Sequence, residues 1–370
     1  MSTKLNLVLI FGGKSGEHDV SLMSARSVLK AVDREKYNVF QVGITRQGRW
    51  TYGTNTLENF EQGTQDSLND ALITTKVERP ALYEVVDGTL QKITQIDVVF
   101  PILHGTFGED GTIQGLFEIQ NCAYVGAGVL ASSLAMDKSL CKDVIAAAGI
   151  PVLEYKTFNR KQIETNLKEV VKEAEQISPY PLFVKPANLG SSVGISKAKN
   201  YQELEEALRF AALYDRRILV ERGIEAREIE LSVLGNEDPI VSQPGEIVPG
   251  DEFYTYQDKY LSGDPEVAIP APLPFELQAR IQAWAIRAFK AIDGAGLSRV
   301  DFLLDKKDGK VYFNEINTMP GFTQISMFSK LLAHDGLAYS KLIDRLIELA
   351  MDRKAEQAIT IRSFEVGNGR

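Results

Sequence analysis

Cysteine is scarce in this chain. Its 370 residues include two cysteines, Cys122 and Cys141, which lie in apolar or helical segments and lack the spacing of a metal site. Disulfide-dense secreted domains and thiolate zinc sites both need more cysteine than this. The composition therefore predicts a reduced compartment, most simply the cytoplasm.

Long apolar runs are also missing. The run LNLVLIF, residues 5–11, is far too short to span a membrane, and Gly12 and Gly13 follow it directly. An apolar run that ends in a glycine turn is typical of a first buried strand and not of a signal peptide. Internal repeats and low-complexity segments are absent from the sequence. We therefore expect a globular protein with no membrane-spanning segment.

Positive charge is in deficit. The chain carries 41 lysines and arginines against 50 aspartates and glutamates, a formal net charge of −9 at pH 7. Proteins that bind nucleic acid usually present a basic surface to its phosphates. Nucleic-acid binding is therefore not expected as the main activity, and an anionic ligand needs a local cationic pocket.

Strands and helices alternate in the first part of the chain. Strand-like apolar runs occupy residues 5–13, 37–45, 96–105 and 123–128, and helical spacing occupies residues 18–32 and 113–122. A polar, turn-rich stretch separates the second strand from the third. This alternation predicts an α/β domain with a doubly wound parallel sheet, which ends near Gly126.

Further α/β structure follows this domain. It begins with a predicted helix over residues 131–149, closed by Gly149 and Pro151 in the usual helix-stop order. A strand, a helix and another strand come next. From Ile229 onward the predicted strands are longer, and a last helix over residues 338–354 closes the fold.

The segment from Arg299 to Phe322 carries the strongest functional signal. VDFLL and VYFNEI have the β-branched and aromatic composition of paired strands, and DKKDGK between them contains an Asp-Gly turn. Side chains alternate along a strand, so Glu315 and Asn317 share one face, and pairing can bring Asp301 beside them. Oxygen ligands without Cys or His favour Mg2+ or Mn2+. The alternative is a solvated hairpin with ordinary surface acids.

Two lysines and a glycine- and serine-rich loop predict an anion site. Lys185 ends an apolar strand, Lys138 lies in the segment MDK, and residues 190–194 read GSSVG. Backbone N–H groups and hydroxyls of such a loop can close over phosphates. An unpaired buried charge costs several kcal/mol, so a bound anion would supply the partner of these lysines. The alternative is a pair of surface lysines with buried stems.

Two segments, one acidic and one rich in aromatic residues, are ambiguous on local grounds. Glu221 ends a predicted strand and Glu228 follows one loop later, where a carboxylate can accept hydrogen bonds from ribose hydroxyls. FYTYQDKYLSG, with Lys259 and Tyr260, has the composition of a mobile lid that brings a cation to a phosphate. Acidic loops such as the first are usually just solvated, and the second segment could equally be a surface loop with its aromatic side chains packed down.

Two candidates lie in the N-terminal domain. FGGKSGEHDVS lacks the full dinucleotide-binding spacing, so it supports a nicotinamide site only weakly. Glu17 starts the first helix, where the helix dipole favours a carboxylate, and simple helix capping is the alternative. His104 follows a buried strand at the carboxyl edge of the predicted sheet, where ligands of α/β proteins bind. A structural role is the alternative for this histidine.

Taken together, seven segments resemble a known family. GGKSGEHDVS, LHGTFGEDGTIQG, MDK, VKPANLGSSVG, FYTYQDKY, RVDFLL and NEINTMPGFT occur in this order between Gly12 and Thr323. They are similar to motifs of the D-alanine–D-alanine ligases of bacterial cell-wall synthesis. The resemblance implies an ATP-grasp fold with three α/β domains, here residues 1–126, 127–221 and 222–362, and a tail at 363–370. It also implies ATP between the last two domains, two Mg2+ or Mn2+ ions, and usually a homodimer.

The resemblance assigns one group of residues to the nucleotide and metals. Oxygen ligands for the metals would come from Asp301, Glu315 and Asn317. The lysines that contact the ATP phosphates would be Lys138, Lys185 and Lys259. The loop that covers the phosphates would contain Gly190, Ser191 and Ser192. The carboxylates that serve the adenosine would be Glu221 and Glu228.

A second group is assigned to the amino-acid substrates. The hydrogen-bonded triad over the D-alanine subsites would consist of Glu17, Ser191 and Tyr260. His104 would lie near the first D-alanine, and Ser326 would contact the carboxylate of the second. Arg299 and the backbone N–H of Gly321 would hold the oxyanion.

The implied reaction joins two D-alanine molecules. The carboxylate of one attacks the γ-phosphate of ATP to give an acyl phosphate and ADP, and the amine of the second then displaces phosphate. Relatives that make D-alanyl-D-lactate lack the Lys259-Tyr260 pair, so its presence favours an amine nucleophile. The alternatives are an ATP-grasp ligase for other substrates, such as D-alanine with D-lactate or D-serine, an NAD-dependent oxidoreductase, and a nucleotide-binding protein without catalysis.

Overall fold

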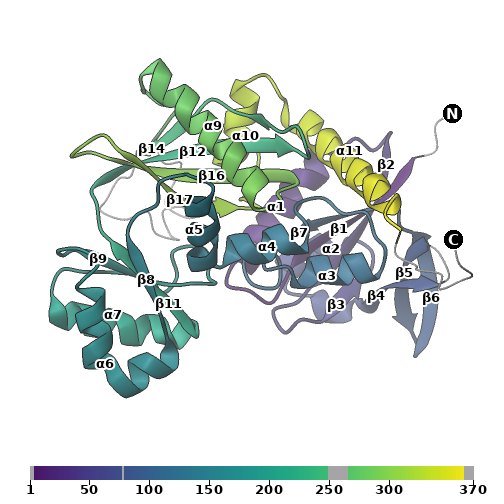
Figure 1. The fold of residues 1–370 in the computed structure, drawn as a ribbon. Helices are drawn as coiled ribbons and strands as arrows, with labels where there is room; N and C mark the ends of the chain where they lie inside the picture. Colours follow the sequence, from purple (N-terminus) through teal and green to yellow (C-terminus); the bar gives the residue numbers. More distant parts are fainter. Residues whose placement is uncertain (1–3, 77–78, 249–265, 362–370) are drawn as a thin grey trace, which may run out of the picture.

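A computed structural model describes residues 4–76, 79–248 and 266–361 (Figure 1). These residues form three β-sheets of seven, four and six strands, with helices packed against them. The strands are β1 (Leu5–Gly12), β2 (Tyr37–Ile44), β3 (Trp50–Tyr52), β4 (Asn69–Lys76), β5 (Arg79–Val86), β6 (Thr89–Gln95), β7 (Val98–Ile102), β8 (Tyr155–Asn159), β9 (Leu182–Pro186), β10 (Ser196–Ala198), β11 (Arg217–Arg222), β12 (Ala226–Gly235), β13 (Ile240–Val241), β14 (Gly245–Val248), β15 (Glu266–Ala268), β16 (Gly296–Asp305) and β17 (Val311–Asn317). The helices are α1 (His18–Ala31), α2 (Thr56–Gln62), α3 (Thr112–Ile119), α4 (Val129–Met136), α5 (Lys138–Ala147), α6 (Arg160–Ala174), α7 (Tyr201–Tyr214), α9 (Phe275–Ala291), α10 (Met327–His334) and α11 (Tyr339–Ala358).

The N-terminal sheet is mixed: part of it has the predicted parallel pairing, and antiparallel strands extend it. Its strand order is β6-β5-β4-β3-β2-β1-β7, and pairing is parallel only between β2, β1 and β7 among the described strands. From β2 to β6, each strand pairs antiparallel with the next strand in the sequence. Between β5 and β6, Asp87 and Gly88 both have positive φ, the conformation of a tight hairpin turn. Such short turns can join only antiparallel neighbours.

Two local predictions also need correction. The segment expected to form a strand over residues 123–128 contributes a single parallel bridge, Val99 with Tyr124. The helix expected over residues 131–149 is two helices, α4 and α5, which meet at Asp137. Asp137 has extended backbone angles, and its carboxylate accepts hydrogen bonds from the N–H groups of Ser139 and Leu140. It thereby caps α5 and ends α4.

The apolar core contains clusters whose residues come from more than one predicted domain. The domain boundaries themselves stay a prediction. One cluster joins β1 and β7 to α10 and α11 from the other end of the sequence, with Phe100 and Leu342 among its members. Figure 1 shows α11 lying against the N-terminal sheet. A second cluster packs α4, α5 and α9 on β12, β16 and β17. A third lies between the central sheet, β10-β9-β11-β8, and helices α6 and α7.

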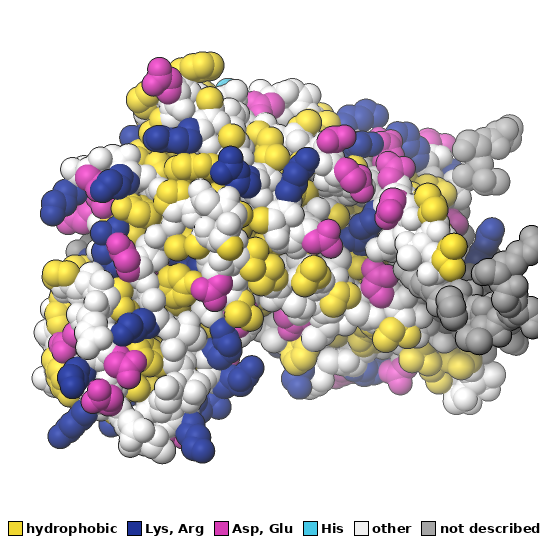
Figure 2. All heavy atoms as spheres, in the orientation of Figure 1, with side chains coloured by type: hydrophobic (Ala, Val, Ile, Leu, Met, Phe, Trp, Pro, Cys, Tyr) yellow, Lys and Arg dark blue, Asp and Glu magenta, His cyan; other side chains and the backbone are white. Residues whose placement is uncertain are grey.

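The outer surface carries charges of both signs. On the face drawn in Figure 2, acidic and basic side chains of the described residues are interspersed.

Among the described helices, none has both the length and the apolar character needed to cross a bilayer.

Candidate active site

The predicted acidic hairpin is present as β16 and β17. Its register pairs Arg299 with Asn317 and Asp301 with Glu315, as alternation along the strands requires. On the other side of β16, β12 pairs Glu230 with Asp301. Residues that pair across neighbouring strands project to the same face of a sheet. Three carboxylates, from Glu230, Asp301 and Glu315, are therefore brought together in a row.

Arg299 compensates part of this negative charge. Its Nε and Nη2 donate to the two carboxylate oxygens of Asp301 at 2.8 and 2.7 Å. Its Nε also lies 3.0 Å from Glu230 Oε2. Burial alone would lower the pKa of Arg299, but Asp301 and Glu230 raise it, so the guanidinium stays charged. The ion pairs fix the guanidinium at the carboxylate row.

The donor chemistry of the row fits a hard divalent cation. Asn317 Nδ2 lies 3.2 Å from Asp301 Oδ2 and 3.5 Å from Glu315 Oε1, so the three predicted ligands lie together. In the described ranges, no group of three or more His, Cys, Asp and Glu side chains is arranged to hold a metal. The three predicted ligands would give a site of two carboxylates and an amide. Such a sparse oxygen set suits Mg2+, which keeps other ligands from water or phosphate.

A lysine cluster faces the acidic row. Lys138 Nζ donates to the carbonyl of Leu189 at 2.7 Å and lies 3.7 Å from Glu315 Oε2. Lys185 forms an ion pair with Glu221, which is 2% exposed. Burial alone would lower the pKa of Lys185, but Glu221 raises it. The partner of this lysine is thus a protein carboxylate, where we had expected a bound anion. Glu221 is held by lysines, and its role toward adenosine stays a prediction.

Lys142 is a member of this cluster that sequence reasoning missed. Its Nζ lies 3.0 Å from the second oxygen of Glu221, and its side chain is 1% exposed. Burial alone would raise the pKa of Glu221, but Lys142 and Lys185 lower it to about 2. The sequence contained one indication of this role: Lys142 follows Lys138 by four residues in a predicted helix. That spacing places both side chains on the same face of the helix.

Glu17 and Ser191 meet although 174 residues separate them. The Ser191 hydroxyl donates a short hydrogen bond to Glu17 Oε1. Glu17 precedes α1 without a side-chain capping bond, so the alternative of simple helix capping is wrong. Gly190 allows the close approach, because a Cβ there would lie 2.9 Å from Glu17 Oε2. Two members of the predicted triad are thus together; Tyr260, like Lys259, lies outside the described residues.

His104 is buried and connects two distant segments. One ring nitrogen, Nδ1, lies 3.0 Å from the carbonyl of Met319, and Nε2 lies 3.0 Å from Ser24 Oγ. Burial alone would lower the pKa of His104, but the carboxylate of Glu109, 3.7 Å from Nδ1, raises it. These contacts fix the segment that leads to Gly321. A direct role toward substrate stays a prediction.

Ser326 is the N-cap residue of α10. Its hydroxyl accepts a hydrogen bond from the N–H of Thr323 at 3.1 Å and lies 2.7 Å from the hydroxyl of Thr323. Its own side chain makes no capping bond to the helix. The N–H groups at the start of a helix favour an anion, which is compatible with the carboxylate contact expected for Ser326.

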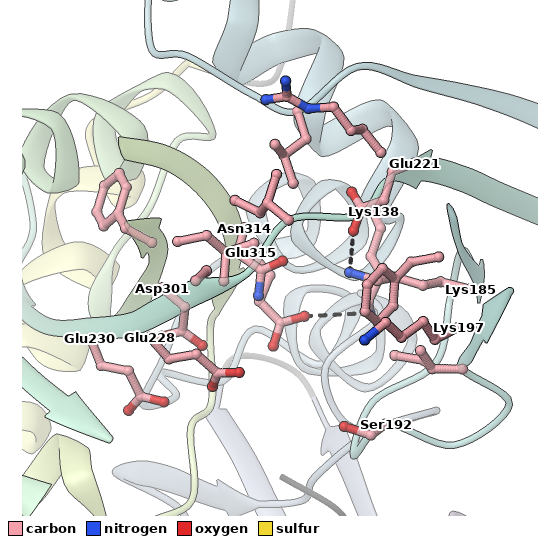
Figure 3. Close-up of a pocket in the computed structure, with 18 of the residues that line it drawn as sticks. Lys138, Lys185, Ser192, Lys197, Glu221, Glu228, Glu230, Asp301, Asn314 and Glu315 are labelled. Carbon is pink, nitrogen blue, oxygen red and sulfur yellow. Dashed lines mark ion pairs between the residues drawn. The ribbon is translucent and has the colours of Figure 1, made fainter. Parts of the chain in front are cut away.

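A pocket of about 380 Å³ lies between the acidic row and the lysines. Figure 3 shows Glu228, Glu230 and Asp301 on one side, and Lys138, Lys185 and Lys197 across from them. The predicted site residues that line it are Lys138, Lys185, Gly190, Ser191, Ser192, Glu221, Glu228, Arg299, Asp301 and Glu315. Glu17, His104, Asn317, Gly321 and Ser326 are not among its lining residues. Most of the described residues expected to bind the nucleotide and metals therefore line this pocket. Most of those expected to bind the amino-acid substrates do not.

Comparison with known proteins identifies the family. The family model described as "D-ala D-ala ligase N-terminus" matches residues 6–127, and "D-ala D-ala ligase C-terminus" matches residues 144–348. A D-alanine–D-alanine ligase of Heliobacterium modesticaldum is 50% identical over 96% of this chain and 96% of its own length. That of Acetivibrio thermocellus is 47% identical over 95% of this chain and 97% of its own.

Solved structures agree with these relatives. The D-alanine–D-alanine ligase of Coxiella burnetii superposes with a TM-score of 0.81 at 34% identity, covering 97% of each chain. The D-Ala:D-Ser ligase VanG of Enterococcus faecalis superposes with a TM-score of 0.82 at 36% identity, covering 94% of this chain and all of its own. The fold is therefore the ATP-grasp architecture expected from the motifs, and this chain belongs to the D-alanine–D-alanine ligase family.

Proposed function

We propose that this protein uses ATP to join two D-alanine molecules into D-alanyl-D-alanine for peptidoglycan synthesis. The observation that carries the proposal is the pocket with Lys138 and Lys185 on one wall and Asp301 and Glu315 on the other. Cations that face carboxylates across a cleft suit a polyphosphate bound together with divalent metal. Family membership narrows this chemistry to acid–amine ligation.

The first chemical step transfers a phosphoryl group. The carboxylate of one D-alanine attacks the γ-phosphate of ATP, and ADP leaves. Lys138 and Lys185 stabilise the negative charge on the phosphate oxygens, and the Gly190–Ser192 loop covers them. Mg2+ or Mn2+ held by Asp301, Glu315 and Asn317 would supply further charge neutralisation at the phosphates. Lys259 would contribute a cation from the lid.

The second step forms the peptide bond. The amine of a second D-alanine attacks the acyl carbon, and phosphate leaves. Arginine has five N–H donors, and the ion pairs of Arg299 with Asp301 and Glu230 use those on Nε and Nη2. The guanidinium therefore keeps donors for the oxyanion, which it would stabilise together with the Gly321 N–H. Glu17 and Ser191 would orient the substrate.

One assay tests this function. ADP and phosphate release are measured with D-alanine alone, with D-alanine mixed with D-serine or D-lactate, with L-alanine, or with no amino acid. Each reaction is run with and without Mg2+, and products are identified by mass spectrometry. We expect release that requires D-alanine and Mg2+, with the dipeptide as main product. A main product of D-alanyl-D-serine or D-alanyl-D-lactate would contradict the proposal, as would release independent of amino acid.

Two expectations about the setting of the enzyme stay predictions. The homodimer is implied by the family resemblance, and light scattering after size-exclusion chromatography measures it directly. The cytoplasmic location rests on the cysteine content and apolar runs of the sequence. The oxidoreductase alternative gains no support from the relatives, which are named as ligases.

A further inference from the structure

Lys142 is a buried cation behind the pocket wall. Its side chain is 1% exposed, and its Nζ faces Glu221 Oε2 at 3.0 Å. That ammonium group makes no hydrogen bond of normal geometry within the described part of the chain. Lys142 does not line the pocket, whereas Lys185 and Glu221 do. A group so placed acts on the pocket through its charge and through Glu221.

Packing alone does not explain this lysine. Burying an ammonium group costs several kcal/mol unless it is paired, and an apolar side chain would fill the same space without that cost. Lys142 lies on α5, whose neighbouring Cys141 and Ile145 belong to an apolar cluster. A charge retained in such surroundings indicates an electrostatic role.

The charge balance of the pocket shows what that role can be. The described lining residues include as many acidic as basic side chains. Glu221 and Lys185 alone form a neutral pair, so Lys185 would offer little net attraction to a phosphate. With Lys142 on the opposite oxygen of Glu221, the three groups carry a net charge of one positive unit. Because the carboxylate of Glu221 is shared between Lys142 and Lys185, it neutralises Lys185 only in part, and Lys185 can still attract an anionic ligand.

We infer that Lys142 is a positioning residue for the nucleotide, which balances and orients Glu221 so that Lys185 remains an effective phosphate-binding cation. This inference rests on the proposed function, because it concerns the adenine nucleotide of that reaction. Because Lys142 does not line the pocket, it would act without contacting the substrates. Its effect is on a ligand that carries phosphate and not on the nucleoside part.

The test compares binding of ADP and of adenosine, without turnover. ADP affinity is measured by calorimetry and adenosine affinity by ligand-observed NMR. Lys142→Met removes the charge and keeps the length of the side chain. We expect its ADP affinity to fall roughly tenfold or more, as for loss of a nearby unit charge, while adenosine affinity is unchanged. Equal ADP affinity in the variant and the wild type, or an equal loss for ADP and adenosine, would overturn the inference.

Two further variants keep the test decisive. The double variant Lys142→Met with Glu221→Gln removes both buried charges, so Lys185 is no longer neutralised by a carboxylate. It should bind ADP more tightly than Lys142→Met does. If the single variant Lys142→Met does not fold, the double variant should bind ADP with near wild-type affinity. A double variant whose ADP affinity is lowered tenfold contradicts the charge account. Lys36→Met is the control for loss of a paired lysine charge elsewhere, because the half-exposed Lys36 pairs with Asp344 through a 2.7 Å contact away from the pocket. If wild-type protein binds no ADP, the proposed function itself fails.

Discussion

Replacing Gly105 by alanine should separate the function of Glu17 from the stability of the fold. A Cβ on Gly105 would lie 3.3 Å from Glu17 Cδ and closer still to Oε2, inside van der Waals contact. The atoms it meets are the end of a flexible side chain, so we expect the carboxylate to move by about 1 Å while the backbone stays in place. The hydrogen bond from Ser191 to Glu17 would then be lost.

The size of each effect follows from this geometry. Gly105 has φ +72°, where alanine is disfavoured by roughly 1–2 kcal/mol. Gly63 has φ +71° with no atom within 4 Å of where a Cβ would lie, so Gly63→Ala carries the same strain without the contact. A misplacement of about 1 Å in a substrate-positioning group can lower rates by about 100-fold. Both variants should lose similar stability, and only Gly105→Ala should lose about 100-fold in kcat/KM for D-alanine.

The measurements are urea unfolding for both variants and an ADP-release assay over a range of D-alanine concentrations. Similar kcat/KM values in Gly105→Ala and Gly63→Ala would refute the role of Glu17. A much larger stability loss in Gly105→Ala would show that the loop, and not the carboxylate, responds to the added methyl group.

Three further changes test other parts of the site. Arg299→Ala should lower turnover by about 10²–10³ while ADP still binds, measured by steady-state kinetics and calorimetry; near-normal turnover would refute its oxyanion role. Asp137→Ala removes the cap of α5 together with the ion pair to Arg217, whereas Asp137→Asn loses the ion pair and keeps a capping side chain; the alanine variant should therefore be about 1 kcal/mol less stable to urea unfolding than the asparagine variant. The pKa of Glu221 is lowered from 4.5 to about 2, so its contribution to stability is present above pH 4.5 and is lost as pH falls toward 2. Urea unfolding across this window should show a steeper fall for the wild type than for Glu221→Gln, and equal slopes would contradict the assignment.

The hairpin was predictable because its signals are local. An Asp-Gly turn between β-branched runs specifies the register, and the register decides that Asp301 faces Glu315. The Gly/Ser loop and the lysines were found for the same reason, since each lies beside a recognisable strand or helix end. Ordered motifs then linked segments that the fold brings together, as with Glu17 and Ser191.

The features that escaped prediction depend on tertiary contacts. Strand β6 is largely exposed, so its sequence TLQKITQ has no apolar alternation to detect. The break between α4 and α5 depends on the carboxylate of Asp137, and helical periodicity does not register a cap inside a continuous apolar pattern. The sequence around Lys142 does not distinguish it from a surface lysine on a helix. Its burial against Glu221 becomes visible only in the folded structure.

The shared core of the two chain ends has a consequence for biosynthesis. Strands β1 and β7 pack with residues of α11, including Leu342 and Ile343. During translation these strands leave the ribosome long before α11 is made, and domains otherwise tend to fold as units in chain order. Helices α1 and α2 cover part of the same apolar face. The part that α11 covers therefore stays exposed until nearly the whole chain has emerged. Transiently exposed apolar surface of this kind favours aggregation of a growing chain.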